Sequence, residues 1–279
     1  IDDFFLKFEA TYWKFLKQIR HFLRIRTAQL TISEISFIAI WYKCSHFSNF
    51  KAFFTWLKED KSHLFKSLPC YQRMIHLINI HQLALQALHV ALMKGQYKQY
   101  LWIDSTTLPV CKNQRIQRHK SLVRIASRGK SSMGWFYGCK LHIAMNQFGE
   151  IACSALSNGH IADIKMVEHL VEGLEAKLYA DRGYISQDLK SRLKDQGIDL
   201  ITYHRKNMRT VQLCAQDEYH LKQRNKIETL FSLLKGQYNL VTSKARSIRG
   251  FLSGIYASLC AYQLTHRNKP TIQIMESLA

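Results

Sequence analysis

The chain has 279 residues, 47% of them hydrophobic, which fits one large domain or two modest ones and excludes a disordered protein. Lys and Arg number 40 against 20 Asp and Glu, so the formal charge of +20 predicts a polyanionic partner, nucleic acid before a membrane, with a merely basic soluble protein as the alternative. No apolar run approaches the roughly 18 residues of a membrane span. The seven cysteines form no CxxC pair, which argues against a zinc ribbon or a disulfide framework and predicts a cytoplasmic protein. Together with the positive charge, this predicts association with the nucleoid.

Residues 1–95 predict an all-α region. Thr31-Ile-Ser-Glu34 has the pattern of a capping box that opens a helix over 35–42, and Pro69 favours the start of another helix. The segment from 68 to 90 is the best candidate for a pair of helices that bind a DNA end in the major groove. A packing or dimerisation module is the alternative, and the sequence leaves both open.

Beyond residue 95 the pattern changes to strands that alternate with helices. Short apolar runs predict strands over residues 100–104, 136–145, 151–156, 177–181 and 198–203. Amphipathic segments predict helices over residues 163–174, 186–196, 217–234 and 251–266. This alternation predicts an α/β domain over residues 96–279, in which helices flank a mixed sheet.

Carboxylates are rare where the chain is most basic. From Lys61 to Gly149 the single acid among thirteen Lys and Arg is Asp104, and from Tyr219 to Met275 the single acid among nine is Glu228. A DNA-binding surface avoids carboxylates because they repel phosphate. Each isolated acid therefore indicates either an ion pair or cap, or a divalent cation held between carboxylate and phosphate.

Three carboxylates are candidates for a shared metal site. Asp104 and Asp181 each end a predicted strand, at the sheet edge where α/β proteins bind ligands. Glu228 lies near the edge of an apolar helix stripe and is predicted to face the rim of the sheet, with Arg224 and Lys235 almost in line with it. Carboxylates suit Mg²⁺, with Mn²⁺ as a substitute, and two such ions can promote phosphoryl transfer.

Local structural roles compete with metal binding at each position. Asp104 could cap a strand end, Asp181 could pair with its neighbour Arg182, and Glu228 could pair with the arginine one turn before it. The flanking residues favour metal binding at all three. At Asp163, which follows a Gly-His pair, a helix cap is favoured over metal binding.

Basic side chains outside these motifs are candidates for DNA contact. The stretch from 112 to 130 has seven bases and no acid, and a solvated loop is the alternative. The full set of candidate DNA-binding residues is Lys112, Arg115, Arg118, Lys120, Arg124, Arg128, Lys130, Arg205, Lys206, Arg224 and Lys235. Trp135 could stack on a flipped or terminal base, or lie in the core.

Four motifs in order resemble those of the DDE transposases of bacterial insertion sequences, and most closely the insertion sequence 982 group. They are Asp104-Ser-Thr, Gly138-Cys-Lys-Leu-His142, Ala180-Asp-Arg-Gly-Tyr184 and Arg224-x3-Glu228-x6-Lys235. The resemblance covers about residues 100–240, and the helical N-terminal part more weakly. In related families a Tyr lies three residues before the Arg, where this chain has Leu221.

The resemblance implies an RNase H-like, retroviral-integrase-like catalytic domain with a Mg²⁺-dependent triad of Asp104, Asp181 and Glu228. It also implies DNA cleavage and strand transfer at terminal inverted repeats, with transposon ends and target DNA as partners and a homodimer in the synaptic complex. The alternatives are a metal-dependent nuclease of the same fold and a non-catalytic basic DNA-binding protein.

Overall fold

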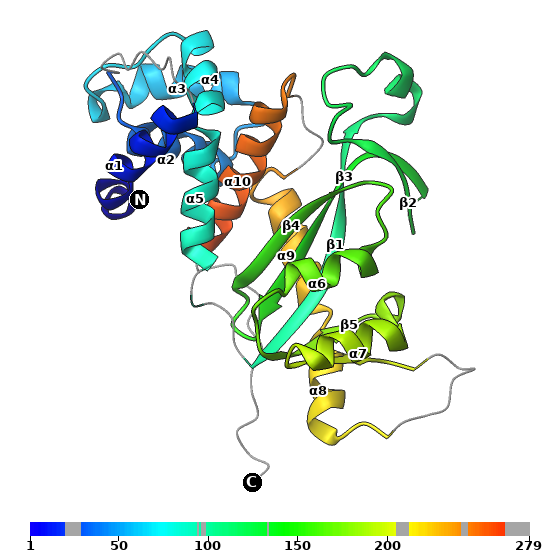
Figure 1. Cartoon of the computed structure of the whole chain (residues 1–279). Coiled ribbons are helices and arrows are strands. Elements are labelled where there is room, and N and C mark those ends of the chain that lie inside the picture. Colours follow the sequence, from blue (N-terminus) through cyan, green and yellow to red (C-terminus); the bar gives the residue numbers. More distant parts are fainter. Residues whose placement is uncertain are drawn as a thin grey trace. The chain divides into compact units, whose positions relative to one another are not determined.

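The computed structural model describes residues 1–19, 29–93, 95, 99–132, 134–204, 212–240 and 245–265. Its contacts divide the chain into two compact units. The helical unit contains residues 1–92, 237–240 and 245–264, and the sheet unit is built around residues 93–236 (Figure 1).

The helical unit is formed by packed helices and one 3₁₀ turn. Their bounds are α1 (Asp2–Ile19), α2 (Ile32–Cys44), α3 (Phe50–Asp60), η1 (Ser62–Leu64), α4 (Tyr71–Ile80), α5 (Gln82–Met93) and α10 (Ile248–Leu264). The predicted capping box is present: the Thr31 hydroxyl accepts from the Glu34 amide, and the Glu34 carboxylate accepts from the Thr31 amide at 2.7 Å. Among the described residues no single helix is long and apolar enough to cross a membrane; α4 and α5 reach that length only as a pair bent by 54°.

Helix α10 belongs to the helical unit rather than to the predicted domain over residues 96–279. Most of its side chains are buried, including Phe251, Leu259 and Tyr262. A helix that is apolar on most sides needs neighbours on most sides, and α2 and α4 provide them. Periodicity alone identified this helix but could not identify the elements that cover it.

The sheet unit contains a six-stranded mixed sheet. Its strands are β1 (Tyr100–Cys111), β2 (Ser127–Ser131), β3 (Gly134–Asn146), β4 (Ile151–Asn158), β5 (Ala176–Ala180) and β6 (Ile198–Thr202). The order is β2-β3-β1-β5-β6, with β4 also paired to β3. β1, β5 and β6 are parallel, whereas β3 is antiparallel to its neighbours, so the sheet is mixed as predicted.

Short helices surround this sheet. They are η2 (Asn113–Arg118), η3 (Asp163–Met166), α6 (Val167–Leu170), η4 (Arg182–Tyr184), α7 (Gln187–Asp195), α8 (Ala215–Gln223) and α9 (Lys226–Gly236). Two predicted helices are corrected. The helix predicted over 163–174 is only η3 followed by one turn of α6, and the helix predicted over 217–234 breaks at 224–225 into α8 and α9.

The alternation of side chains along β1 fixes the two faces of the sheet. Leu101 and Ile103 join the buried cluster that includes residues of α6 and α7. These two helices lie in front of the sheet in Figure 1. Trp102 points to the opposite face, where its indole N–H donates to the His220 carbonyl of α8 at 2.7 Å. Polar side chains that follow Trp102 at even spacing therefore emerge beside α8 and α9.

Candidate active site

Asp104 and Asp181 lie at the same level of two adjacent parallel strands. β1 and β5 pair so that Trp102 stands opposite Tyr179, and the same register two residues later sets Asp104 opposite Asp181. Because side chains alternate, both aspartates share the face of Trp102 and Tyr179. Neighbouring strands lie about 4.8 Å apart, so the two carboxylates are brought together.

The two aspartates reach this level in different ways. Asp181 directly follows β5, as predicted. Asp104 does not end its strand: it lies inside β1 and pairs with Ile143 of β3. β1 continues for seven further residues because β3 remains its antiparallel partner after β5 has ended. The predicted strand end at residue 104 is therefore wrong, although the position of the carboxylate in the sheet is unaffected.

Arg224 links Asp104 to Glu228. It lies at the break between α8 and α9, with one guanidinium nitrogen 3.3 Å from Asp104 Oδ2 and another 3.3 Å from Glu228 Oε1. The Glu228 side chain is 61% exposed, so the prediction that it does not face open solvent is wrong, although its charge still acts on Asp104 at the edge of the sheet. The exposure follows from the helical repeat, since Ile227, Leu230 and their neighbours occupy the buried side of α9. The i,i+4 ion pair between Arg224 and Glu228, which the sequence offered as the alternative to metal binding, is thus present.

The site carries more negative charge than its arginine neutralises. The pKa of Asp104 is raised to about 6: burial is the main cause and the charges of Asp181 and Glu228 add to it, while the Ser105 amide and Arg224 act in the opposite direction. The three carboxylates are therefore close enough to repel one another. Binding of a divalent cation would relieve this repulsion, because the charge of the ion reverses the local electrostatics.

The donor atoms fit Mg²⁺ or Mn²⁺, which prefer carboxylate oxygens. Asp104 Oδ1 accepts from the Ser105 amide at 2.7 Å and Asp181 Oδ1 accepts from the Gly183 amide at 2.7 Å. Each carboxylate has further lone pairs with which to bind a cation. Within the described part of the chain no three His, Cys, Asp or Glu side chains are already arranged to bind a cation. Arg224 accounts for this at the proposed site, because it lies between Asp104 and Glu228.

Tyr184 is a site residue that the sequence analysis did not single out. It is buried in the apolar cluster that contains Ile103. Burial, followed by the charges of Asp104, Asp163 and Asp181, raises the pKa of its hydroxyl far above the ordinary value of 10. The phenol is therefore protonated at neutral pH and can donate a hydrogen bond. Its place in the Ala180–Tyr184 motif is the sequence signal that could have identified it.

Asp163 does not cap a helix, contrary to the prediction. Its Oδ1 accepts from Lys140 Nζ at 2.9 Å, and the same ammonium donates to the Ile161 carbonyl at 2.9 Å. Ala162 is the residue at the N-cap of η3, without a side-chain cap. A cap would have required local geometry, whereas the ion pair depends on β3 lying beside this turn. Lys140, inside the Gly138–His142 motif, is thus a buried cation near the carboxylates.

Two grooves meet at Asp181. The first is lined by both aspartates and Tyr184, together with basic and aromatic side chains: Arg128, Lys130, Trp135, Lys140 and His160. The second extends from Asp181 past α8 and is lined by Arg182, Tyr203, Lys222, Arg224 and Asn225. A polyanionic strand that crosses the carboxylates would therefore meet cations on both sides.

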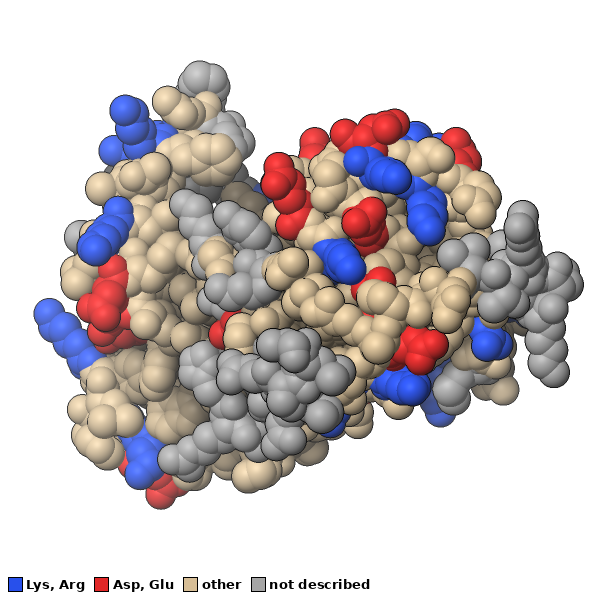
Figure 2. All heavy atoms as spheres, turned by 90° about the horizontal axis from the view of Figure 1, so that it is seen from below, with Lys and Arg blue, Asp and Glu red and all other residues tan. Residues whose placement is uncertain are grey.

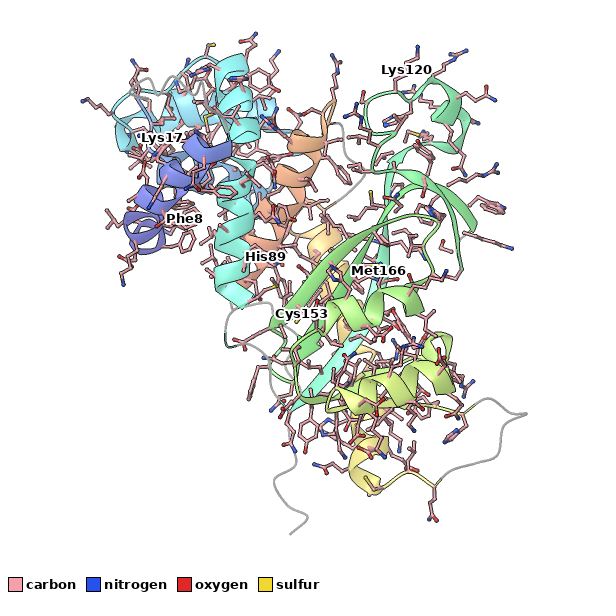
Figure 3. All side chains as sticks on the ribbon, in the orientation of Figure 1. Phe8, Lys17, His89, Lys120, Cys153 and Met166 are labelled. Carbon is pink, nitrogen blue, oxygen red and sulfur yellow. The ribbon has the colours of Figure 1, made fainter. Side chains whose placement is uncertain are left out.

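The candidate DNA-binding residues have different environments. All seven bases between 112 and 130 are exposed, over η2, a turn and the unpredicted strand β2, and no ion pair of the described residues involves them. Lys120 extends outward from this region in Figure 3. Lys235 is half-buried, and burial lowers its pKa. Arg205 and Lys206 lie outside the described residues.

The face drawn in Figure 2 carries acidic and basic side chains interspersed, so charge does not mark that face as a DNA-binding surface. Trp135, by contrast, is 54% exposed in the first groove. The alternative that it is a core tryptophan is therefore wrong, because its place at the start of β3 leaves the ring beyond the buried part of the sheet.

Comparisons with known proteins give a family and a fold. Residues 94–248, more than half of the chain, match the family model described as "Transposase DDE domain". A cryo-EM structure of piggyBac transposase in a synaptic complex with hairpin DNA is similar with a TM-score of 0.52 and 11% identity, over 88% of this chain and 68% of that chain. No curated protein sequence matches significantly. The structural likeness confirms the predicted RNase H-like mixed sheet with a helical N-terminal region.

Proposed function

Because the chain belongs to the family of transposase DDE domains, we propose that it cleaves and joins DNA at the terminal inverted repeats of an insertion sequence, in a reaction that requires Mg²⁺ or, as a substitute, Mn²⁺. The observation that carries the proposal is the juxtaposition of Asp104 and Asp181 on adjacent parallel strands, with Glu228 near enough to raise the pKa of Asp104. A metal site shared by three carboxylates would explain why isolated acids occur in such a basic protein.

Asp104, Asp181 and Glu228 are the proposed catalytic and metal-binding residues. Bound divalent cations would activate a water or a 3′-hydroxyl and neutralise charge on the leaving oxygen. For Glu228 to bind with the aspartates, Arg224 has to leave at least one of its two carboxylate partners. A DNA phosphate is a suitable new partner, because a guanidinium binds phosphate oxygens in the same two-pronged manner as a carboxylate.

The surrounding cations are proposed to hold the DNA. Arg224 and Lys235 are expected to bind phosphates near the reacting group, and the exposed bases from 112 to 130 are expected to bind the backbone further away. Lys235 supports this assignment, since it is half-buried and has no carboxylate partner among the described residues. An anion beside it would restore the pKa that burial lowers.

The finer identity follows from the sequence motifs and stays a proposal. We assign the chain to the insertion sequence 982 group of bacterial transposases, acting in the cytoplasm at the nucleoid. Joining two transposon ends to target DNA in one reaction requires two active sites, so a homodimer is the proposed synaptic form.

The test is a joining assay that distinguishes a transposase from a nuclease. Purified protein is incubated with labelled duplexes that carry the ends of the element encoding it, with a supercoiled plasmid as target. The proposal predicts plasmid-linked label in Mg²⁺ and none in EDTA. Asp104→Asn, Asp181→Asn and Glu228→Gln should each abolish joining while DNA binding is retained.

A matched control is Glu172→Gln, which neutralises a carboxylate that is 81% exposed and forms no part of the proposed site. It should join DNA like the wild type. Cleavage without joined product would identify a nuclease of the same fold. Joining by any of the three triad variants would show that the catalytic residues are assigned wrongly, and DNA binding without any metal-dependent reaction would indicate a non-catalytic binding protein.

A further inference from the structure

Trp135 has an unusual environment for a large aromatic side chain. It is 54% exposed although tryptophan is highly buried on average. The ring lies in the groove that also contains Asp104 and Asp181. A flat apolar surface is therefore open to solvent beside the carboxylates of the proposed active site.

Two cations accompany this ring. Lys130 is the cross-strand partner of Trp135 in the β2–β3 pair, and Arg128, two residues earlier, shares the same face of β2. The Arg128 guanidinium carbon lies 4.8 Å from the ring centroid, and Lys130 Nζ lies 5.9 Å from it. An aromatic surface with two adjacent positive charges matches one nucleotide, which has an aromatic base and phosphates on either side.

The hairpin that carries these residues is held firmly against the loop after β4. A Cβ added to Gly129 would lie 2.1 Å from the Gly159 carbonyl oxygen, so the two backbones are in direct contact. The His160 amide donates to the Ser127 hydroxyl at 3.0 Å. The Asn113 side chain donates to the Trp135 carbonyl at 2.8 Å. The ring is thus mounted on a fixed support, which lowers the entropy lost on binding.

Resting on the proposed function for its ligand, DNA, we propose that Trp135, Arg128 and Lys130 form a stacking site for an unpaired nucleobase of the strand that enters the active site. A base inside a duplex has both faces covered by its neighbours, so only an unpaired or terminal base offers a face to the ring. The site therefore selects DNA that is frayed or single-stranded next to the reacting phosphate. Arg128 and Lys130 bind the phosphates that flank this base.

The experiment measures binding without catalysis. Fluorescence anisotropy in EDTA compares a short blunt duplex with the same duplex carrying a single-stranded overhang, using the full chain. The wild type should prefer the overhang. Trp135→Ala should weaken binding of the overhang probe about tenfold and leave the blunt duplex within about twofold, whereas Trp135→Phe, which keeps a stacking ring, should retain most of the preference.

A second readout reports stacking directly. The fluorescence of 2-aminopurine, placed in the overhang, should fall when the wild type binds and should not fall with Trp135→Ala. Phe148→Ala is the matched control, because Phe148 is also an exposed aromatic at 47% but lies in the turn after β3, away from the groove. It should behave like the wild type in both measurements.

Two results would overturn the stacking site. One is an unchanged overhang preference in Trp135→Ala; the other is an equal loss on both probes in Trp135→Ala and Trp135→Phe, which indicates a structural role only. Because these measurements need no metal, they are independent of the joining assay. A protein that stacks the overhang but never joins DNA refutes the transposition reaction alone, and one that joins DNA without stacking refutes this site alone.

Discussion

Replacement of Asp104 by Asn should stabilise the fold while it abolishes the reaction. The side chain is only 23% exposed, and burial raises its pKa to about 6 from an ordinary 3.8. The folded state therefore binds the proton more tightly than the unfolded state. The free energy of unfolding therefore falls as pH rises from about 4 to about 6. Above that range it is lowered by the full cost of the buried Asp104 charge.

The magnitude follows from this difference in pKa. At 1.36 kcal/mol per pH unit, the change from 3.8 to about 6 corresponds to about 3 kcal/mol at pH 8. The value already includes the attraction of Arg224. Because Asn is neutral and of nearly the same shape, Asp104→Asn should recover about 2–3 kcal/mol at pH 8 and almost nothing at pH 4.

Thermal unfolding followed by circular dichroism in EDTA measures this effect. The variant should melt several degrees above the wild type at pH 8, and the two curves should coincide near pH 4. Added Mg²⁺ should then raise the melting temperature of the wild type at pH 8 and affect the variant much less, because one ligand is lost. A gain that is absent at pH 8, or of equal size at both pH values, would show that Asp104 does not carry a buried charge.

Three further predictions concern the β2–β3 hairpin, helix α10 and the basic surface. Gly129→Ala should lower the free energy of unfolding by about 2 kcal/mol or more in urea titrations, since its Cβ would meet Gly159 backbone atoms at 2.1 and 2.6 Å. Gly254→Ala, a helical position with open space around it, should instead stabilise by about 0.5–1 kcal/mol, and a loss there would contradict the packing of α10. Lys120→Ala and Arg124→Ala should each weaken DNA binding and reduce the slope of log affinity against log salt by about one. An unchanged slope in both variants would remove the exposed 112–130 stretch from the DNA interface.

Local patterns in the sequence were sufficient for the elements and for the candidate acids. The capping box at Thr31, the hairpin around Gly149 and the strand before Asp181 formed as predicted, since each depends on hydrogen bonds and side-chain alternation within a few residues. The isolation of Asp104 and Glu228 among basic residues is likewise a property of composition and needs no coordinates.

Only the tertiary structure decided which groups meet. Asp104 and Arg224 are 120 residues apart in the chain, yet they form an ion pair, and Asp163 pairs with Lys140 of β3 instead of capping a helix. The length of β1, the unit to which α10 belongs and the exposure of Trp135 were also decided by partners from distant segments. Periodicity reports which side of an element is apolar, but a strand ends, and a charge is buried or paired, according to neighbours that the local sequence does not contain.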